Sequence, residues 1–484
     1  MTTRRLMTVF CPRRWGVAGA ILAAAVAALA LLSSAGAGKE RPNLVIVTID
    51  TLREDRVSAY GWGRATTPNL DRLAERGVLF ERPYAQIPET LPSHASMMTG
   101  RYPYSLRCER NWTPLSDSAE TLAEILRARG YATAAFVSAA VLARPFNMEQ
   151  GFEVFSDNLD VRLSEQALLE LPYRGLWRAQ AVFRGESEVP AEATVSRALW
   201  WLKHKGREPF FLWVHLYSPH SPYLAPEPYR HKFKAEGDGL LEQLDALYDG
   251  EVAYADAQTG RLLDALRGRV GKRTIVCVLS DHGEGLGHKD YLLHVQFTYE
   301  PELRIPWIMA GPGIPQGKRV PSLVQTVDLA PTLLELLGVG ALPGMQGKSL
   351  VPLMQGKVEM VNEYVAGQRG VQTEPLRRLT LVGPPVALHA HQRWLVVDGE
   401  SPMKLIYGRG PGPEAVVVPE LYDLRADPEE TRNLAQDETA TLSEMYRRLT
   451  EVERMWEKEA AAPEAARQLP PEIEQRLRAL GYIR

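Results

Sequence analysis

The sequence has few cysteines and no excess of either charge. Among 484 residues only Cys11, Cys108 and Cys277 occur, which excludes a disulfide scaffold and a cysteine-based zinc site. Cys277 lies inside the apolar run TIVCVL, which predicts a buried free thiol rather than a disulfide with Cys108. Lysine and arginine together number 56 against 59 aspartates and glutamates, giving a net charge of −3. The chain therefore lacks the basic footprint of a nucleic-acid-binding protein, and we expect no nucleic-acid partner.

An apolar stretch from Gly16 to Leu32 is preceded by four arginines and followed by small residues. This order of features is typical of a secretory signal, which we assign to residues 1–38. The stretch is close to the lower limit for crossing a bilayer, so an uncleaved membrane anchor is the alternative. Because the arginines should stay on the cytoplasmic side, we expect the rest of the chain to be extracytoplasmic. It would then be periplasmic or secreted, or anchored in the membrane by residues 16–32.

Beyond Arg41, short apolar runs alternate with helical segments. Strands are predicted over residues 43–49, 132–137, 210–216, 274–279 and 305–310. Helices are predicted from Pro68 to before Gly77 and over 247–266, with 152–192 as an excursion from the sheet. This alternation predicts an α/β fold, a sandwich with a mostly parallel central sheet covered on both faces, over residues 41–350.

The pattern of apolar and turn-forming residues changes after residue 350. Extended pieces at 386–391, 394–397, 404–407 and 420–422 are separated by Gly, Pro and Asp turns. They predict a small antiparallel sheet, which with charged helices at 438–460 and 471–480 forms a C-terminal part over 351–484.

Polar residues follow three of the predicted strands. Asp50 follows the first strand, and Asp281 with His282 follows the fourth. The strand at 210–216 carries His215 near its end and leads to His220. Because ligands bind beyond the carboxyl ends of strands in an open α/β sheet, these carboxylates and imidazoles predict a divalent metal site.

A fourth segment, TLPSHASMMTGR from Thr90 to Arg101, predicts a short helix. Pro92 suits its first turn and Gly100 its C-terminal cap. Thr90 then stands just ahead of the helix N-terminus, where free N–H groups favour negative charge. A hydroxyl that also binds a metal at this position is a candidate nucleophile.

Together these segments resemble the sulfatase family of the alkaline-phosphatase superfamily. The resemblance is carried, in order, by NLVIVTIDTLRED, TTPNLDRLAERGVLF, LPSHASMMTGRYP, HLYSPHSPY, SDHGEGLG, LRIPWIMAGPG, QTVDLAPTLLELLG and ELYDLRADPEETRNLA. It implies an alkaline-phosphatase-like α/β/α sandwich with a small C-terminal antiparallel sheet. It also implies one divalent metal ion, with ligands Asp50, Thr90, Asp281 and His282.

The sequence departs from the sulfatase pattern at three positions. Thr90 stands where sulfatases carry the Cys or Ser that is oxidised to formylglycine, and oxidation of threonine would give a ketone, so no formylglycine is expected. His94 replaces an arginine, and Thr51 replaces the second aspartate of the usual pair. The site is therefore less rich in oxygen than a calcium site, and Mn or Zn becomes as plausible as Ca. The Thr-x-Pro-Ser-His pattern is similar to nucleotide pyrophosphatases and phosphodiesterases, in which an unmodified threonine attacks phosphorus.

The resulting hypothesis is a metal-dependent hydrolase of sulfate or phosphate esters, with Thr90 as nucleophile. His220 is the first catalytic candidate, for binding the ester or protonating its leaving group, and His294 is the second, for acid/base work or a second metal. The candidates for substrate binding are His94, His288 and Lys289. The substrate would be a small-molecule, lipid or glycan ester. Two alternatives stay open: a phosphoryl transferase at the membrane, and a catalytically silent binding protein with the sulfatase fold.

Overall fold

The computed structural model describes residues 41–157, 189–267, 272–295, 297–340, 342–370, 391–409, 418–461 and 471. The predicted signal or anchor at 16–32, most of the excursion at 152–192 and the helix at 471–480 lie outside these ranges, apart from single positions. Within the described ranges, no helix has both the length and the hydropathy needed to cross a membrane. Residues from Pro42 onward form one compact unit.

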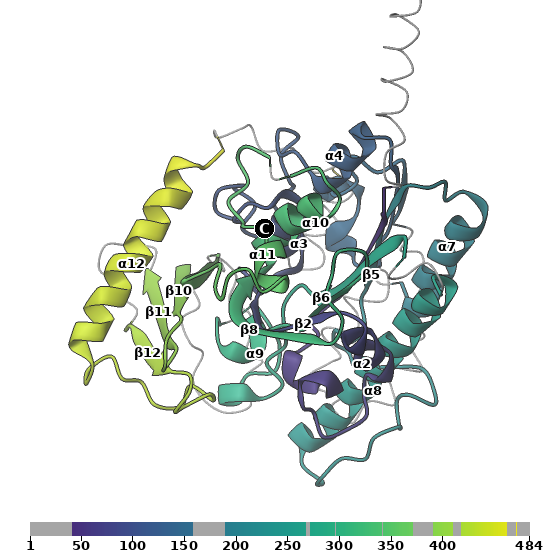
Figure 1. The fold of residues 1–484 in the computed structure, drawn as a ribbon. Coiled ribbons are helices and arrows are strands. Elements are labelled where there is room, and N and C mark those ends of the chain that lie inside the picture. Colours follow the sequence, from purple (N-terminus) through teal and green to yellow (C-terminus); the bar gives the residue numbers. More distant parts are fainter. Residues whose placement is uncertain are drawn as a thin grey trace, which may run out of the picture. The chain divides into compact units, whose positions relative to one another are not determined.

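An eight-stranded sheet forms the centre of this unit, in the order β4-β3-β5-β1-β6-β7-β2-β8 (Figure 1). Neighbouring strands are parallel except at β7, which runs antiparallel to β6 and β2. The mostly parallel sheet predicted from the sequence is therefore confirmed. The strands are β1 Asn43–Ile49, β2 Val78–Tyr84, β3 Ala132–Phe136, β4 Val154–Ser156, β5 Phe210–Leu216, β6 Thr274–Ser280, β7 Trp307–Ala310 and β8 Lys318–Gln325.

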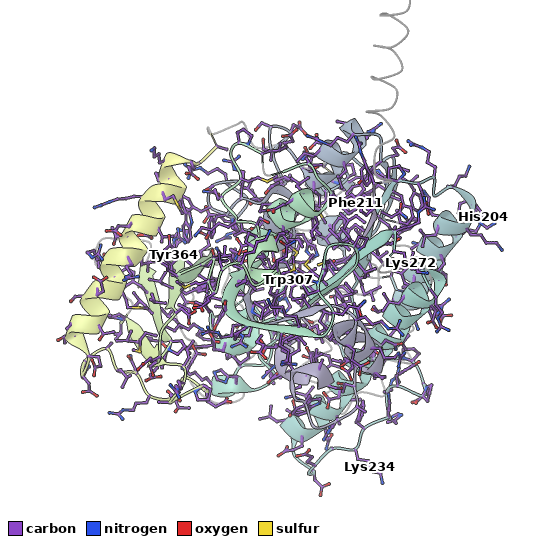
Figure 2. All side chains as sticks on the ribbon, viewed as in Figure 1. His204, Phe211, Lys234, Lys272, Trp307 and Tyr364 are labelled. Carbon is purple, nitrogen blue, oxygen red and sulfur yellow. The ribbon has the colours of Figure 1, made fainter. Side chains whose placement is uncertain are left out.

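Helices cover both faces of this sheet because its central strands are apolar on both sides. One face packs against α2 (Pro68–Glu75), α7 (Ala191–His204) and α8 (Leu240–Ala265). The other face packs against α3 (Thr90–Thr99), α4 (Leu122–Ala128), α10 (Leu329–Leu336) and α11 (Val351–Met354). Phe211 and Trp307 lie inside, whereas Lys234 and Lys272 lie at the periphery (Figure 2).

Shorter helices occupy the connections. The described ranges contain α9 (Glu300–Leu303) and the 3-10 turns Glu54–Arg56, Ser58–Tyr60, Ala140–Leu142, Arg144–Phe146, His288–Asp290 and Thr326–Asp328. Cys108 and Cys277 are both buried and free, as the sequence predicted for Cys277.

A second sheet of four antiparallel strands lies in the C-terminal part, in the order β12-β11-β10-β9 (Figure 1). Its strands are β9 Tyr364–Arg369, β10 His391–Val397, β11 Met403–Arg409 and β12 Glu420–Asp423. The helix α12 (Thr439–Lys458) buries Met445, Leu449, Val452 and Trp456. The small antiparallel sheet is confirmed, and three of its strands contain the predicted segments at 394–397, 404–407 and 420–422.

The two sheets are joined by a buried ion cluster. The ammonium of Lys404 on β11 lies 2.9 Å from Glu300 Oε1 and 2.8 Å from Glu430 Oε1. Lys404 and Glu430 are fully buried, and Tyr84 on β2 donates a hydrogen bond to Glu300 Oε2. This cluster connects the C-terminal sheet to α9, which directly follows the polar loops at the strand ends.

Candidate metal centre and nucleophile

The central strands place two aspartates side by side. Parallel pairing of β1 with β6 sets Ile49 opposite Ser280. Asp50 and Asp281 are the next residues, so they lie side by side where the two strands end. Both side chains are fully buried. The pairing of β1 with β5 brings His215 to the same edge, opposite Thr48.

Backbone N–H groups form hydrogen bonds with only one of the two carboxylate oxygens of Asp281. Its Oδ1 accepts hydrogen bonds from the N–H groups of Thr51, at 3.1 Å, and His282, at 2.9 Å. Thr51 has a φ of 56°, a left-handed conformation that costs a β-branched residue about 1–3 kcal/mol. Oδ2 makes no hydrogen bond with the described residues and lies 3.6 Å from His282 Nε2. One carboxylate oxygen thus remains available to a cation.

The tautomer of His282 follows from its neighbours. Its Nδ1 lies 2.9 Å from the carbonyl oxygen of Gly283, which only accepts, so Nδ1 carries the proton. The lone pair on Nε2 then faces Asp50 Oδ1 at 3.9 Å and the Thr90 hydroxyl at 3.4 Å. A histidine ligand with its second nitrogen bound to a carbonyl is the usual arrangement in metal sites.

Thr90 reaches this cluster from α3. It is the first residue of the helix, one position further in than the sequence predicted, with Glu89 as the N-cap. Gly100 ends the helix with a φ of 66°, as expected for a left-handed cap. The hydroxyl of Ser93 donates to the Asp281 carbonyl at 2.7 Å, which ties α3 to the loop after β6. Thr90 is 3% exposed.

This arrangement fits a divalent cation. Ligand atoms of Asp50, Asp281 and His282 all lie within 4.8 Å of one another, in a buried position. Burial would raise the pKa of Asp281, but the nearby imidazoles, His282 foremost, and the Thr51 hydrogen bond hold that pKa below its usual range. Two buried carboxylates facing each other need positive charge between them.

His94 lies beside the cluster and is fully buried. Its Nδ1 donates to the Thr90 carbonyl at 2.7 Å, and its Nε2 accepts from the Thr48 hydroxyl at 3.0 Å. Burial lowers the pKa of His94 to about 3, so the ring is neutral. The arginine of the sulfatase pattern is thus replaced by an uncharged side chain that contacts the backbone of Thr90.

His220 and His294 form a row of rings with His282. The centroid of the His294 ring lies 4.6 Å from the centroid of the His282 ring and 4.8 Å from that of the His220 ring. His220 Nδ1 donates to the Ser221 carbonyl at 2.7 Å, and His294 Nδ1 lies 3.2 Å from Glu284 Oε1. The structure therefore brings both predicted catalytic histidines next to the metal cluster.

His288 and Lys289 instead contact residues of the C-terminal part together with Tyr299. His288 Nδ1 lies 3.6 Å from Glu429, and burial lowers its pKa to about 4. Lys289 donates to the Tyr422 hydroxyl at 2.9 Å and lies 3.8 Å from the centroid of the Tyr299 ring. Their role in substrate binding stays a prediction.

Three features of the site were not predicted as such. His215 was expected at the edge of the sheet where the metal site forms but not among the ligands, and neither the N–H of Thr51, which donates to Asp281, nor the hydroxyl of Ser138, which contacts His215, was expected. A signal for His215 was present, since it is the only ionisable residue in the otherwise apolar strand FFLWVHL.

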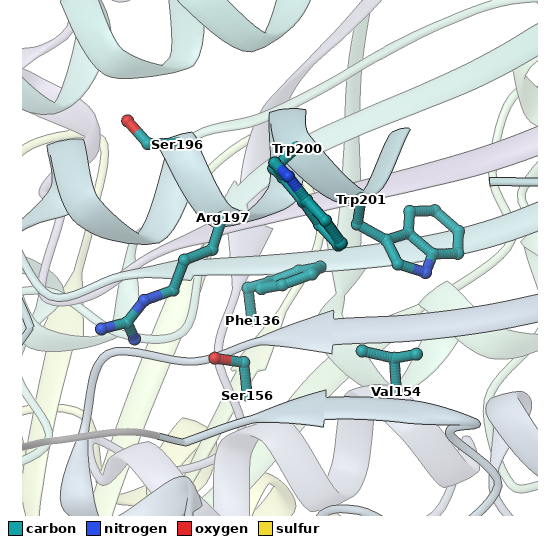
Figure 3. Close-up of a pocket in the computed structure, with 7 residues that line it drawn as sticks. All are labelled: Phe136, Val154, Ser156, Ser196, Arg197, Trp200 and Trp201. Carbon is teal, nitrogen blue, oxygen red and sulfur yellow. The ribbon is translucent and has the colours of Figure 1, made fainter. Parts of the chain in front are cut away.

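A pocket of about 400 Å³ lies elsewhere, between α7 and the strands β3 and β4 (Figure 3). It is lined by Phe136, Val154, Ser156, Ser196, Arg197, Trp200 and Trp201. None of the residues in the metal cluster lines this pocket, and it contains no acid, histidine or cysteine.

The fold is alkaline-phosphatase-like, and its strand ends group residues that could hold a metal ion. Residues 42–339 match the family model named Sulfatase, and the chain belongs to the sulfatase family. It is thus a hydrolase of a family whose named members act on sulfate esters.

The relatives agree with this assignment. The chain is 28% identical to Delta 4,5-hexuronate-2-O-sulfatase of Bacteroides thetaiotaomicron, over 84% of this chain and 88% of the relative. It is 27% identical to the multifunctional alkaline phosphatase superfamily protein PehA of Trinickia caryophylli, over 82% and 92%.

A solved structure, the phosphonate monoester hydrolase of Agrobacterium radiobacter, is similar in fold. Its TM-score is 0.67 at 22% identity, covering 86% of this chain and 96% of that one.

Proposed function

We propose that this chain hydrolyses sulfate or phosphate esters with unmodified Thr90 as nucleophile, in a site where one cation is held by Asp50, Thr90, Asp281 and His282. The observation that carries the proposal is the 3.4 Å separation between the Thr90 hydroxyl and His282 Nε2, at the first turn of a buried helix. The hydroxyl thus shares its surroundings with the candidate metal ligands.

In the proposed reaction, Thr90 Oγ attacks phosphorus or sulfur in line with the leaving oxygen. The bond from Oγ to the central atom forms as the bond to the leaving oxygen breaks, and water then hydrolyses the threonine ester. When bound, the cation would supply positive charge that favours loss of the Thr90 hydroxyl proton to water before the attack and that stabilises the charge on the equatorial oxygens. The free N–H groups at the start of α3 act in the same direction.

The leaving oxygen needs a proton, and two imidazoles are suitably placed to supply it. His294 lies between His282 and His220 in the row of rings, and it is the half-buried member of the three. Its Nδ1 is oriented by Glu284, as expected for a general acid supported by a carboxylate. His220 is the second candidate for this step and for contacting the ester oxygens.

The chemistry of the donors favours Mn or Zn alongside Ca, and no formylglycine is part of the mechanism. A threonine nucleophile forms a simple ester, so we expect turnover of phosphorus esters to exceed turnover of sulfate esters. The similarity to PehA and the shared fold with a phosphonate monoester hydrolase support testing both classes. The apolar stretch at 16–32 supports an extracytoplasmic location.

The test compares p-nitrophenyl phosphate, bis-p-nitrophenyl phosphate and p-nitrophenyl sulfate with added Mn, Zn or Ca. We expect Thr90→Ala to be inactive and Thr90→Ser to retain part of the activity. Thr99→Ala is the matched control, because Thr99 is buried at the other end of α3, where its hydroxyl donates to the Ala95 carbonyl and accepts from the N–H of Arg101 just past the helix. Equal turnover by Thr90→Ala and wild type would overturn the proposal.

A mass measurement adds a second readout. The peptide containing Thr90 should have its unmodified mass in the resting enzyme, and rapid quenching during turnover should add one phosphoryl or sulfuryl group. A ketone or aldehyde mass at this position would contradict an unmodified threonine.

A further inference from the structure

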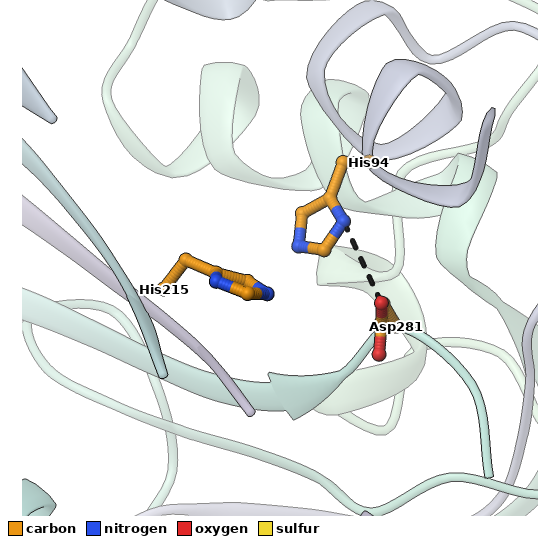
Figure 4. Close-up of side chains that lie close together, drawn as sticks. All are labelled: His94, His215 and Asp281. Carbon is orange, nitrogen blue, oxygen red and sulfur yellow. Dashed lines mark ion pairs between the residues drawn. The ribbon is translucent and has the colours of Figure 1, made fainter. Parts of the chain in front are cut away.

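His215 lies at the carboxyl end of β5 with its ring directed into the space beside the metal cluster. It is fully buried, and it shares one face of the strand with Phe211 and Trp213. Figure 4 shows His94 and His215 turned toward Asp281 from two different elements. One ligand atom from each of these three residues lies within 4.8 Å of the other two.

Hydrogen bonding fixes the tautomer of His215. The hydroxyl of Ser138 donates its only proton to the His215 carbonyl, at 2.6 Å. The same oxygen lies 3.1 Å from His215 Nδ1, so it must accept there, and Nδ1 carries the proton. The neutral ring therefore presents a bare Nε2.

This bare nitrogen faces a carboxylate. His215 Nε2 lies 3.5 Å from Asp50 Oδ2 and accepts no hydrogen bond from the described residues. A lone pair directed at a carboxylate oxygen inside a protein is unfavourable unless a proton or a cation lies between them.

The spacing suits a cation. Two ligands at about 2.1 Å from one ion, at a roughly tetrahedral angle, lie about 3.4 Å apart. The separation between His215 Nε2 and Asp50 Oδ2 is 3.5 Å, and that between His282 Nε2 and Asp281 Oδ2 is 3.6 Å. The two imidazoles thus approach the two carboxylates in the same way.

His94 provides the contrast. Its Nδ1 lies 3.7 Å from Asp281 Oδ2, but that nitrogen donates to the Thr90 carbonyl. Its Nε2 accepts from Thr48, whose oxygen in turn accepts from the indole N–H of Trp213 at 3.0 Å. Both nitrogens of His94 are engaged, so of the two neighbouring rings only His215 offers a lone pair.

We propose that His215 is an additional ligand, through Nε2, of the cation at Asp50, Asp281 and His282. Ser138 then has the role of the outer partner that orients the ring, as carbonyl and carboxylate groups do for histidine ligands elsewhere. Two imidazole nitrogens make the site prefer zinc or manganese to calcium, which binds oxygen ligands. The inference rests on the metal site of the proposed function, but not on Thr90 as nucleophile.

The test counts imidazole ligands by X-ray absorption of the zinc-loaded full chain and measures zinc affinity by competition with a chelating dye. His215→Asn keeps an N–H for Ser138 and removes the Nε2 position. We expect the imidazole count to fall from two to one and zinc affinity to fall about 10- to 100-fold. His215→Gln places an amide oxygen near Nε2, so it should recover part of the affinity and bind calcium relatively better.

His94→Asn is the matched control, because it alters a buried histidine next to His215 and should leave the count at two. A wild-type count of one, or unchanged zinc affinity in His215→Asn, would overturn the inference. Because both readouts are independent of turnover, an inactive wild-type enzyme with two imidazole ligands would refute the proposed function alone.

Discussion

The ring of His94 donates a hydrogen bond from Nδ1 to the carbonyl oxygen of Thr90, with 2.7 Å between the two atoms. Behind it, Nε2 accepts from Thr48, which accepts from the indole of Trp213. All four residues are almost completely buried. The histidine of the T-x-P-S-H segment is thus part of a hydrogen-bonded chain that holds the residue carrying the candidate nucleophile.

These linked hydrogen bonds make His94 a positioning residue. We expect His94→Leu to lower kcat about 100-fold, since a small displacement of a reacting group can have an effect of that size. His94→Asn should be less affected, because an amide N–H can occupy the place of Nδ1. KM and the metal content should change little in both variants. A purely structural role would instead be indicated by equal losses in the two variants that follow their melting temperatures.

Removal of the metal should destabilise the protein. A ligand present at 100 times its dissociation constant stabilises the folded state by about 2.7 kcal/mol. We therefore expect a strong chelator to lower the melting temperature by several degrees, and added zinc or manganese to restore it. A melting temperature that does not respond to chelation of a metal-containing preparation would contradict a buried ion between Asp50 and Asp281.

The variant Asp281→Asn provides the comparison for this experiment. It removes one of two facing buried carboxylates, so its melting temperature should be insensitive to chelator. It should also be less stable than the metal-free wild type, because the imidazole of His282 and the N–H of Thr51 stabilise the ionised form of Asp281 and hold its pKa below the usual range. A variant more stable than the metal-free wild type would show that repulsion between the two buried carboxylates outweighs these interactions.

Gly283 should not tolerate a side chain. A Cβ at this position would lie 1.9 Å from the backbone carbonyl oxygen of Pro301. Gly283→Ala must therefore displace the loop that carries Asp281 and His282, at a cost of about 1–3 kcal/mol in stability. We expect a lower melting temperature together with weaker metal binding.

The control for this substitution is Gly63→Ala. A Cβ at Gly63 would have no heavy atom within 4 Å, so stability and metal affinity should both be unchanged. Wild-type metal affinity in Gly283→Ala would contradict the close packing of this loop against Pro301.

The ion cluster between the two sheets should contribute strongly to stability. Lys404→Met leaves Glu300 and Glu430 as buried carboxylates without their ammonium, and breaking such a cluster costs about 3–5 kcal/mol. Urea denaturation of Lys404→Met should show this loss. Adding Glu430→Gln in the same chain should recover part of it, since one uncompensated charge is removed. A double variant no more stable than Lys404→Met would contradict charge burial as the cause.

Much of the fold could be predicted because its strands are short apolar runs. The five strands predicted in the large sheet overlap β1, β3, β5, β6 and β7, which are buried throughout. The strand β2 was missed because VLFERPY interrupts its apolar pattern with charged residues and a proline. The edge strands β4 and β8 were missed for a related reason, since an edge strand has only one neighbour and tolerates polar side chains.

The start of the helix α8 could not be predicted from the sequence, for a different reason. The sequence predicted 247–266, but the helix begins at Leu240. Its first turns carry few buried residues, so periodicity gives no signal there. Helix ends are set by local capping and tertiary contacts more than by the apolar pattern.

The sequence by itself determined which residues could carry the chemistry. Strand ends followed by Asp50, Asp281 and His282, and a helix start at Thr90, are local features that periodicity and residue type reveal. Only the tertiary structure decided which nitrogen His94 and His215 present. That choice depends on hydrogen-bond partners far away in the chain, such as the Ser138 hydroxyl that accepts from His215 and the Thr48 hydroxyl that donates to His94. A proton on one ring nitrogen fixes a lone pair on the other, and no spacing along the chain encodes where that lone pair points.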